Sequence, residues 1–578
     1  MQRLFTHARE PAKGAHSLTT HSPLLVKLLV NRGYTTEEAA ARYLKPSYEN
    51  HLHNPFLMHD MERAVVRVYE AIKKEEKIVV YADYDCDGIP GAVILHDLLK
   101  KIGYENFVVY IPDRHTEGYG LNRPAVEQFI TDDVKLIITI DLGTTNHEDI
   151  AFAQEHGVDV IVTDHHLPHA TLPAAFAVVN PKIGADTESA YPDPMLCGSG
   201  VMFKFVQAFL SKYGEEFKVG AGWEKWLLDM AGLATLSDMV PLTGENRAIA
   251  SFGMQVFRKS PRPGIMQLLR KLSIDQRTIM EDDITFMVTP RLNAASRMDS
   301  PMRAFELLSE RDSLKAGTVA DHLTKINDER KQIVARIMKD VKAKLSEREL
   351  GPIIVIGNPE WRVGVVGIVA GKIMDEYNRP VFVWGREGIG EVKPGEPLLV
   401  KGSCRSNGAV NVVDLMTAAR EHFLEFGGHE LAGGFSVAQD SVYHLEEKLC
   451  ALFDTLKKDL VTTGAVIDAT LSLSDVNDNT TTMINRLAPF GLGNPKPLFL
   501  FKNVTIKKTK QFGKEKNHLE IIVTDDMQLE RTAMSFFADG DTFTKKASEG
   551  ARIDLVATLE KSYFAGRTTI RLRILDIL

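Results

Sequence analysis

The chain has 578 residues, which is too many for one hydrophobic core, so we expect three or four domains. Hydrophobic residues make up 44% and charged residues 25%, as in an ordinary soluble globular protein. The longest apolar runs, at 136–140 and 352–356, are far shorter than a membrane span, which excludes a protein built from transmembrane helices. The first residues lack the apolar core of a signal peptide, so we expect none.

The four cysteines are widely separated along the chain, and no C-x-x-C pair occurs: Cys86, Cys197, Cys404 and Cys450. This spacing argues against a zinc ribbon and against a disulfide framework. We therefore expect a reduced, cytoplasmic protein.

The formal net charge of −8 argues, taken alone, against a polyanionic partner. Local charge matters more in a multidomain protein, because bound metal offsets the negative charge of a carboxylate cluster. Segment 501–516 carries six lysines against one glutamate. A lysine run is most often a solvated surface, so this segment needs other support before it indicates binding.

The predicted elements begin with two short helices within residues 1–60. Between about 70 and 185, apolar strands at 77–82, 106–111, 134–140, 158–163 and 175–180 alternate with amphipathic helices, for example at 92–103 and 148–157. Continuous apolar strands alternating with helices are typical of a parallel α/β sheet. A mainly helical region follows from 198 to about 345, and its last part predicts a long charged connector helix.

A second α/β unit begins near residue 352 and continues to about 455. The last block contains strand-like segments with alternating apolar residues and glycines, which predict a small antiparallel β-barrel. We expect an α/β protein whose domain bounds are a helical segment at 1–60, a first α/β domain with its helical part at 61–310, a connector helix at 311–350, a second α/β domain at 351–460 and a barrel at 466–578.

Acidic residues and histidines follow three of the predicted parallel strands at the point where each strand ends. Because ligands bind at the carboxyl ends of strands in an open α/β sheet, three adjacent strands would bring these side chains to one site. A further acid follows a helical stretch near residue 236. The complete set is Asp83, Asp85, Asp87, Asp141, Asp164, His165, His166 and Asp238.

Carboxylates with imidazole and no thiolate suit Mn²⁺ or Mg²⁺ better than structural zinc. Two such ions, roughly 3.5–4 Å apart, catalyse in-line phosphoryl displacement in many enzymes. One aspartate after a strand is more often a helix cap or a turn residue. A calcium loop is excluded, because the position that requires glutamate is Ile94. Coincidence at three strand ends is improbable, so the set predicts a metal site.

Several ordered motifs resemble those of the DHH phosphoesterases and, among them, the RecJ family of exonucleases. The first four motifs are YADYDCDG, TIDLGTT, VTDHH and ATLSDMVPL. The others are IPDRHTEGYGL, TPRLNAASRM, EWRVGVVGIVAGKI, KGSCRSNG, FGGHELAGG and APFGLGNPKPLF. This resemblance covers nearly the whole chain, and it implies that the second α/β unit is a DHHA1 domain and that the C-terminal barrel is an OB fold.

The resemblance implies a role for each matching residue. Asp83, Asp85, Asp141, His165 and Asp238 correspond to metal ligands, and Asp87 and Asp164 to ligands or to residues that orient them. His166, Asp141 and Arg297 are the expected catalytic residues. The expected contacts to phosphate or DNA are Arg114, Ser403, Arg405, Ser406, Gly428, His429, Lys507, Lys508, Lys510 and Phe512.

The chain departs from the family's motifs at several positions, and one of them, Cys404, lies beside the proposed phosphate site. Cys404 and Ser296 stand where the family has glycines, and Arg362 and Val363 replace a histidine and a proline. The second motif also reads D-L-G-T where D-N-G-I is usual. None of these changes removes an expected metal ligand.

The resemblance implies an exonuclease that degrades single-stranded DNA 5′→3′ with two Mn²⁺ or Mg²⁺ ions, in recombination and repair. We expect a monomer, with a single-strand-binding protein or a helicase as a further partner and no membrane contact. The alternatives are a DHH phosphodiesterase on short oligonucleotides or cyclic dinucleotides and, less favoured, a non-catalytic replication scaffold. A DHH pyrophosphatase is disfavoured because it needs only two domains.

Overall fold

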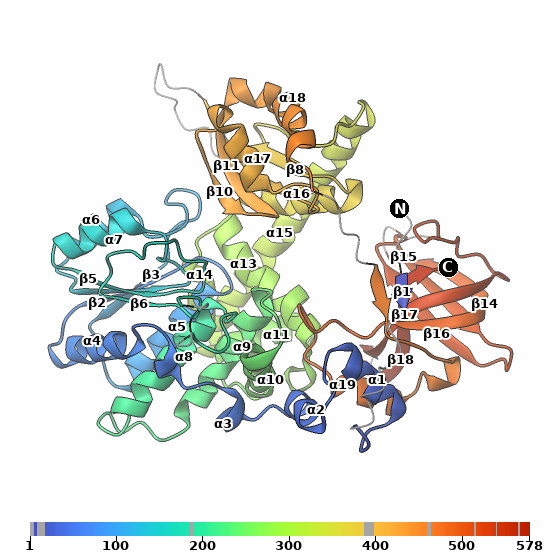
Figure 1. Ribbon diagram of the computed structural model, residues 1–578, viewed down its shortest axis with the longest axis horizontal. Helices are drawn as coiled ribbons and strands as arrows, with labels where there is room; N and C mark the ends of the chain where they lie inside the picture. Colours follow the sequence, from blue (N-terminus) through green and yellow to red (C-terminus); the bar gives the residue numbers. More distant parts are fainter. Residues whose placement is uncertain are drawn as a thin grey trace. The chain divides into compact units, whose positions relative to one another are not determined.

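The first α/β unit contains a five-stranded sheet in the order β3-β2-β4-β5-β6 (Figure 1). The computed structural model gives β2 Ile78–Ala82, β3 Phe107–Tyr110, β4 Leu136–Ile140, β5 Asp159–Thr163 and β6 Ala177–Val179. Every pairing in this sheet is parallel. All residues of β2 and β4 are buried, as expected for central strands covered on both faces. The predicted parallel sheet is confirmed.

Helices cover both faces of this sheet. Helices α4 (Met61–Lys73), α5 (Gly88–Lys101) and α8 (Gly198–Tyr213) lie on one face, and α6 (Arg123–Thr131) and α7 (His147–Glu155) on the other (Figure 1). Both α5 and α8 begin at the carboxyl end of the sheet, so their amino termini reach the edge where the acidic motifs lie.

The structure describes residues 5–7, 18–184, 187, 190–386, 398–458, 464–513, 516–538, 540–564 and 567–578.

A helical layer follows the sheet. It comprises α9 Leu228–Ser237, α11 Pro263–Lys271, α12 Glu281–Asp283, α13 Thr289–Met298 and α14 Met302–Ser309, with a π-helical turn at Ile284–Val288. Helix α10 (Gly244–Phe257) crosses the boundary between the two compact units of the chain, which lies after residue 252. Helix α15 (Ser313–Ser346) has 34 residues, and its capping residue Asp312 accepts hydrogen bonds from the amides of Leu314 and Lys315. It packs along α11 and α13, then along α16. The predicted long connector helix is therefore present.

The second α/β sheet has the order β10-β11-β9-β8-β7. Its strands are β7 Ile354–Gly357, β8 Val381–Gly385, β9 Leu399–Arg405, β10 Glu425–His429 and β11 Ala432–Ala438. Only β7 and β8 pair in parallel; the other described pairings are antiparallel. Its helices are α16 Val363–Tyr377, α17 Val412–Ala418 and α18 Gln439–Leu456.

A second compact unit combines residues 1–53, 239–252 and 462–578. It contains α1 Pro23–Asn31, α2 Glu37–Leu44, α3 Tyr48–His51 and α19 Asp478–Asn485, and the strands β1 Phe5–His7, β12 Ala465–Ile467, β13 Ala469–Thr470, β14 Phe499–Phe512, β15 His518–Thr524, β16 Glu530–Phe536, β17 Arg552–Phe564 and β18 Arg567–Ile577. Leu25, Leu28 and Leu29 of α1 share one core with Phe499 and Phe501 of β14. The structure thus groups the N-terminal helices with the C-terminal barrel.

The barrel closes because β14 pairs with both β15 and β17. Most neighbours are antiparallel, but β16 pairs in parallel with β18, and the short β13 pairs in parallel with β14. The predicted barrel is present, and the prediction that it is antiparallel is wrong at these two pairings, because β18 lies between β16 and β17 and β13 extends the edge of β14. No helix within the described ranges is long and apolar enough to cross a membrane.

Candidate metal centre

The acidic residues lie together because their strands are neighbours. Asp83 follows β2, Asp141 follows β4 and Asp164 follows β5, and these three strands are adjacent in the sheet. Asp141 has a left-handed backbone with a φ of 64°, so the chain turns sharply where β4 ends. Asp238 arrives from another direction, as the residue that ends α9. The predicted convergence of strand ends is present in the structure.

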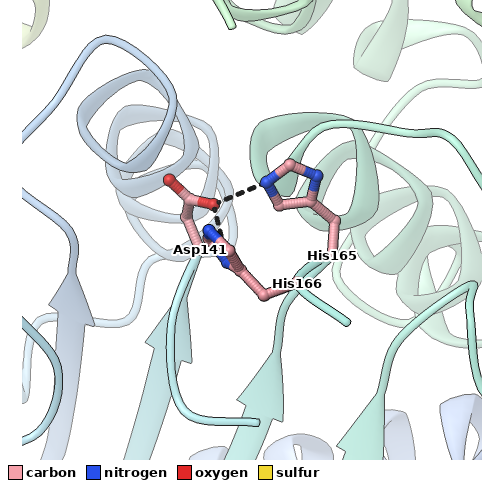
Figure 2. A group of neighbouring side chains, drawn as sticks. All are labelled: Asp141, His165 and His166. Carbon is pink, nitrogen blue, oxygen red and sulfur yellow. Dashed lines mark ion pairs between the residues drawn. The ribbon is translucent and has the colours of Figure 1, made fainter. Parts of the chain in front are cut away.

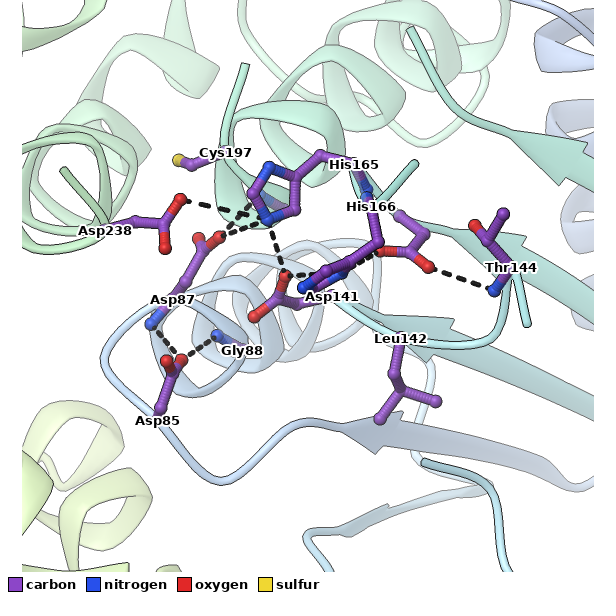
Figure 3. Close-up of polar contacts among 12 residues, drawn as sticks. Asp85, Asp87, Gly88, Asp141, Leu142, Thr144, His165, His166, Cys197 and Asp238 are labelled. Carbon is purple, nitrogen blue, oxygen red and sulfur yellow. Dashed lines mark hydrogen bonds and ion pairs between the residues drawn. The ribbon is translucent and has the colours of Figure 1, made fainter. Parts of the chain in front are cut away.

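His165 lies at the centre of this group (Figure 2 and Figure 3). Its Nε2 is 3.1 Å from Asp141 Oδ1, 3.7 Å from Asp87 Oδ2 and 3.8 Å from Asp238 Oδ2. Three sets of side chains could each hold a cation: Asp83, Asp85 and Asp141; Asp87, His165 and Asp238; and Asp141, His165 and His166. Two of these sets share Asp141, and two share His165. The arrangement fits two adjacent ions joined by common ligands.

The electrostatics of these carboxylates favour bound cations. Burial, followed by repulsion from neighbouring carboxylates, raises the pKa of Asp83 and of Asp141 well above its ordinary value. The same causes raise the pKa of Asp238 to about 9. The buried atoms Asp83 Oδ1 and Asp141 Oδ1 accept no hydrogen bond from the described residues. Carboxylate oxygens that repel one another and accept no hydrogen bond, together with an imidazole nitrogen, form a set of ligands that suits Mn²⁺ or Mg²⁺.

Asp87 combines proximity to His165 with strong hydrogen bonds. Its carboxylate accepts from the amides of Gly198 at 2.6 Å and Ser199 at 2.7 Å, both at the amino terminus of α8. Asp85 meanwhile accepts from the amides of Asp87 and Gly88 at 2.7 and 3.2 Å, which fixes the loop (Figure 3). Helix α8 therefore anchors the acidic loop beneath the centre.

Asp164 belongs to none of the three cation-binding sets, because both of its oxygens are engaged. Its Oδ1 accepts from His166 Nδ1 at 2.8 Å and from the His165 amide at 2.7 Å, and its Oδ2 accepts from the Thr144 amide at 3.0 Å. Burial would raise the pKa of Asp164, but the contacts with His166 and Thr144 outweigh it and lower that pKa. This geometry favours the orienting role over ligation.

His166 is poised to carry a proton. Burial lowers its pKa, but the hydrogen bond and charge of Asp164 outweigh burial, and the net pKa is raised. His165 shifts the other way, because burial lowers its pKa and keeps it neutral, as a ligand requires. The ring of His429, at the end of β10, lies parallel to that of His166 with centroids 6.4 Å apart. The second sheet therefore reaches the metal centre.

Arginines gather beside the centre. Burial, followed by the charges of Arg114, Arg330 and Arg405, lowers the pKa of Arg297 to about 9, although Asp85 opposes this shift. Arg405 donates to Ser403 Oγ at 2.9 Å, and the Arg114 guanidinium lies over the ring of Tyr84. An added Cβ at Gly367 would lie 3.1 Å from Ser403 Oγ and 3.2 Å from Arg405 Nη2. These predicted phosphate contacts therefore lie together in one place.

Other predicted contacts have structural roles. Ser406 is buried, and its hydroxyl donates to the Val410 carbonyl at 2.6 Å, so it does not face a ligand. Gly428 has a φ of 142°, and a Cβ there would lie 2.4 Å from the Ala432 carbonyl, so it serves the tight pairing of β10 with β11. The prediction that Ser406 contacts phosphate is disfavoured for this reason.

The barrel residues lie in the other compact unit and are described within it. Lys507 forms an ion pair with Glu530, and Lys510 lies opposite Glu520 on β15, so both lysines have acidic neighbours. Lys508 is exposed. Phe512 contacts the rings of His518 and Phe536, with centroids 5.1 and 5.9 Å apart. The lysine run is thus partly neutralised.

Two residues that lie beside the metal centre were not among the site residues predicted from the sequence. Tyr119 places its hydroxyl 3.3 Å from the Asp141 carbonyl and 3.3 Å from His166 Nδ1. Lys182 donates through Nζ to the His165 carbonyl, and burial lowers its pKa. Tyr119 lies inside the motif IPDRHTEGYGL, and Lys182 follows the strand-ending Asn180-Pro181, so each had a local signal. Neither signal indicates that the chain folds back on the metal centre.

The departures from the family's motifs are accommodated without disturbing the ligands. Cys404 is fully buried on β9, where its Sγ lies 3.0 Å from the position of a Cβ added at Gly433. Ser296 is also buried, and its hydroxyl lies 3.4 Å from the Asn293 carbonyl. Arg362 caps the amino end of α16, and Val363 is its first residue.

Comparison with known proteins identifies relatives for every part of this architecture. The DHH family N-terminal domain matches residues 77–235, the DHHA1 domain 350–461 and the RecJ OB domain 467–576. The single-stranded-DNA-specific exonuclease RecJ of Bacillus subtilis is 33% identical over 96% of this chain and 68% of its own length. The protein of the same name from Haemophilus influenzae is 31% identical over 88% of both chains.

Solved structures show the same fold. The Mn²⁺ complex of RecJ from Thermus thermophilus has a TM-score of 0.80 at 23% identity and covers all of this chain and 79% of its own. A structure of exonuclease RecJ bound to manganese has a TM-score of 0.59 at 28% identity and covers 69% of this chain and 95% of its own. The first likeness establishes that the domains adopt this family's folds.

Proposed function

This chain belongs to the RecJ family of single-stranded-DNA-specific exonucleases, and from that premise we propose that it degrades single-stranded DNA 5′→3′ by metal-dependent hydrolysis of phosphodiester bonds. The observation that carries the proposal is the centre formed where β2, β4 and β5 end. There the carboxylates surround His165, and the buried atoms Asp83 Oδ1 and Asp141 Oδ1 accept no hydrogen bond from the described residues. A role in recombination and repair rests on the family alone.

Two Mn²⁺ or Mg²⁺ ions are the cofactors that this donor set fits, and a related exonuclease RecJ is bound to manganese. We assign their ligands to Asp83, Asp85, Asp87, Asp141, His165 and Asp238. When bound, the ions supply Lewis acidity for an in-line displacement at phosphorus. The chain contributes a rigid frame, because α8 anchors the Asp87 loop and Asp164 fixes the segment that carries both histidines.

His166 contributes a proton donor. Because Asp164 engages its Nδ1, its Nε2 is the atom that can donate to a phosphate oxygen of the bond that is cut. Arg297 adds positive charge beside Asp85, where the phosphate would lie. The raised pKa of His166 favours its protonated form, which can donate.

Polarity follows from a cationic group at the junction of the two sheets. Arg114 follows β3 and Ser403 and Arg405 lie on β9, and we propose that these three residues bind the phosphate at the 5′ end. A strand held there by its 5′ end presents its first internal phosphodiester to the metal centre, so cleavage proceeds 5′→3′. We propose that the barrel, as an OB fold, binds the strand elsewhere along its length.

We further propose that the enzyme acts as a monomer in the cytoplasm, with a single-strand-binding protein or a helicase as partner. All four cysteines are free thiols, which is consistent with a reducing compartment. Sedimentation of the purified protein and pull-down of a single-strand-binding protein would test these points.

The deciding experiment is product analysis on a single-stranded oligonucleotide labelled at its 3′ end, with Mn²⁺, beside a matched blunt duplex. We expect a ladder that shortens from the 5′ end on the single strand and no cleavage of the duplex. Asp141→Ala should abolish the ladder. Asp133→Asn is the matched control, because Asp133 precedes the same strand at its opposite end and is exposed.

Two other outcomes would contradict the proposal. Intact long strands with rapid hydrolysis of dinucleotides would indicate a phosphodiesterase of short substrates. Binding of DNA without cleavage of either substrate would indicate a non-catalytic scaffold.

A further inference from the structure

Helices α13 and α15 carry a group of arginines that extends away from the metal centre. Arg291 and Arg297 lie on α13, and Arg330 lies on α15, which packs along α13. Within the described residues, none of the three forms an ion pair with a carboxylate. The nearest acid, Asp328, is exposed and pairs with Lys331 at 3.2 Å.

This arrangement differs from that of two other buried arginines, Arg67 and Arg262. Arg67 pairs with Glu76 and Asp159 at 2.7 and 2.6 Å, and Arg262 pairs with Asp97 and Asp229, both at 2.8 Å. Those pairs follow the rule that a buried cation is neutralised by its surroundings. Arg291, only 6% exposed, does not follow this rule.

Hydrogen-bond donors at this place also lack acceptors. Arg291 Nε, Arg330 Nε and Asn327 Nδ2 are buried and have no partner among the described residues. Arg330 Nη2 donates to Asn327 Oδ1 at 3.0 Å, which directs the amide nitrogen of Asn327 away from that guanidinium. Asn327 itself is fully buried within α15. Buried donors almost always have acceptors, so this set indicates an anionic ligand with several oxygens.

The positions of the arginines along α13 and α15 indicate which kind of anion binds there. The charges of Arg114, Arg330 and Arg405 all lower the pKa of Arg297. Arg297 lies at the end of α13 that meets α16, because its Nη1 donates to the Gly364 carbonyl at 3.2 Å, and a Cβ added at Gly367 on α16 would lie 3.2 Å from Arg405 Nη2. Arg291 lies six residues earlier on α13, about 9 Å along the helix axis, where its charge acts on Arg330. The series therefore runs from Arg114 and Arg405, through Arg297, to Arg330 and Arg291. If the 5′ end binds at Arg114 and Arg405, the far end of the series lies toward the 3′ side of the strand.

We propose that Arg291, Asn327 and Arg330 form a second phosphate-binding subsite, which holds the DNA backbone on the 3′ side of the bond that is cut. This inference rests on the proposed function and extends it to Asn327 and Arg330, which lie outside the motifs quoted above, and to Arg291, which lies within TPRLNAASRM but was given no role there. The two guanidinium groups offer donors only, and because the Asn327 Oδ1 already accepts from Arg330, the amide nitrogen of Asn327 adds a further donor. Such a set suits a phosphate diester and not a cation. The subsite would hold the strand in register while the 5′ nucleotide is removed.

The test is a scan of single uncharged phosphates. In the Asp141→Ala background with Mn²⁺, so that the strand stays intact, binding is measured by fluorescence anisotropy. The ligands are 5′-phosphorylated oligonucleotides, each with one methylphosphonate at a successive position. We expect one internal position beyond the first phosphodiester to weaken binding roughly tenfold, as for loss of a charge-assisted hydrogen bond. With Arg330→Gln added, the same position should no longer matter.

Lys331→Gln is the matched control, because Lys331 is the next residue on α15, carries the same charge and is exposed. It should leave the scan unchanged. Arg330→Gln should also reduce the slope of log Kd against log salt by about 0.7, the value for one contact to single-stranded nucleic acid. If Arg330→Gln does not fold, Arg291→Gln and Asn327→Asp test the same subsite, and Arg330→Lys should restore part of the affinity.

The outcomes separate this inference from the proposed function. A scan that Arg330→Gln and Arg291→Gln both leave unchanged, in a protein that still binds single strands, overturns the subsite alone. Stabilisation by inorganic phosphate that only Arg330→Gln removes, with an unchanged scan, assigns the site to a free anion and overturns the strand assignment. Failure of the parent protein to bind single strands overturns both proposals.

Discussion

At the scale of single residues, the metal centre depends on how closely the backbone of α8 approaches Asp141. A Cβ added at Gly198 would lie 2.6 Å from the Cβ of Asp141 and 2.8 Å from its Oδ1, well inside van der Waals contact. The amide of the same residue donates to Asp87. Gly198 therefore positions two acids of the centre without touching substrate.

Gly198→Ala is expected to displace Asp141 and to lower kcat roughly 100-fold, since a shift of about 1 Å in a catalytic group costs that much. Gly200→Ala is the control, because it lies in the same helix and its added Cβ would meet nothing closer than 3.5 Å. Steady-state nuclease assays and Mn²⁺ titration should separate the two variants. Equal activity of both would show that the helix yields and that the close approach is unimportant.

The raised pKa values of Asp83, Asp141 and Asp238 predict how metal binding depends on pH. Ligands must lose their protons to bind a cation, so Mn²⁺ affinity should rise with pH up to about 9, the pKa of Asp238. Binding at pH 7 should release roughly one proton or more per protein. Calorimetry in two buffers of different ionisation enthalpy measures this number; no release would contradict the prediction.

The same shifts set the stability of the protein when metal is chelated. When folding raises the pKa of a carboxylate, ionisation of that group lowers the stability of the folded state relative to the unfolded state. The chelated protein should therefore lose stability as the pH rises toward about 9, and Mn²⁺ should restore it. Thermal unfolding with and without chelator across this range is the measurement.

At the scale of elements, a buried ion cluster joins the helices that carry the ligands. Arg262, the residue before α11, contacts Asp97 toward the carboxyl end of α5 and Asp229 in the first turn of α9, both at 2.8 Å. Asp87 lies at the other end of α5, and Asp238 at the other end of α9. The cluster therefore fixes the separation of two helices whose opposite ends meet at His165.

Arg262→Met should destabilise the fold by about 3–5 kcal/mol, because it removes the cation paired with the buried Asp229 and leaves the buried Asp97 with only His96 and the exposed Arg311 among the described residues. Burial raises the pKa of Asp97, but His96, Arg262 and Arg311 outweigh it and lower that pKa. Asp97 therefore stabilises the fold fully at pH values above its unfolded pKa of about 3.9. This stabilisation is lost as the pH falls through the lower pKa that Asp97 has in the folded state. The destabilisation should be largest near neutral pH and shrink in acid.

Arg311→Met provides the control, because Arg311 contacts the same Asp97 at 2.9 Å while its side chain is 65% exposed. An exposed partner contributes about 0–1 kcal/mol. Urea unfolding of both variants at pH 7 and pH 4 measures the difference. Similar losses for both would show that burial of Arg262 is not what matters.

At the scale of the whole molecule, segments from opposite ends of the chain share one core. Leu25, Leu28 and Leu29 of α1 pack in the same cluster as Ile484 of α19 and Phe499 of β14. Deleting residues 466–578 would therefore expose the apolar face of α1 and would not cleanly remove the barrel. Point substitutions are the better test of what the barrel does.

Leu28→Ala should destabilise this unit by about 2–5 kcal/mol, the cost of a cavity at a fully buried leucine. Hydrogen exchange should then quicken in β14–β18, although the substitution lies about 470 residues earlier in sequence than β14. Lys27→Ala, the preceding position on the same helix, should change stability by less than about 0.5 kcal/mol. Unchanged exchange in the barrel would contradict a shared core.

The sequence alone determined the α/β class, the order of strands and helices along the chain, and the aspartates and histidines at the strand ends. Those features are local: an apolar run defines a buried strand, and parallel strands all end at the same edge. The metal site was predictable because β2, β4 and β5 happen to be neighbours, and its ligands follow directly after them in sequence.

Only the tertiary structure decided the remaining features. It engages both oxygens of Asp164, buries Ser406 against the Val410 carbonyl and pairs Lys507 with Glu530. It also brings Arg330 on α15 close to Arg291 on α13, and α1 into the core of the barrel. Each of these depends on contacts between segments far apart in the chain or on how a side chain turns within a loop. Local periodicity carries no information about such contacts, because they are set by packing between elements.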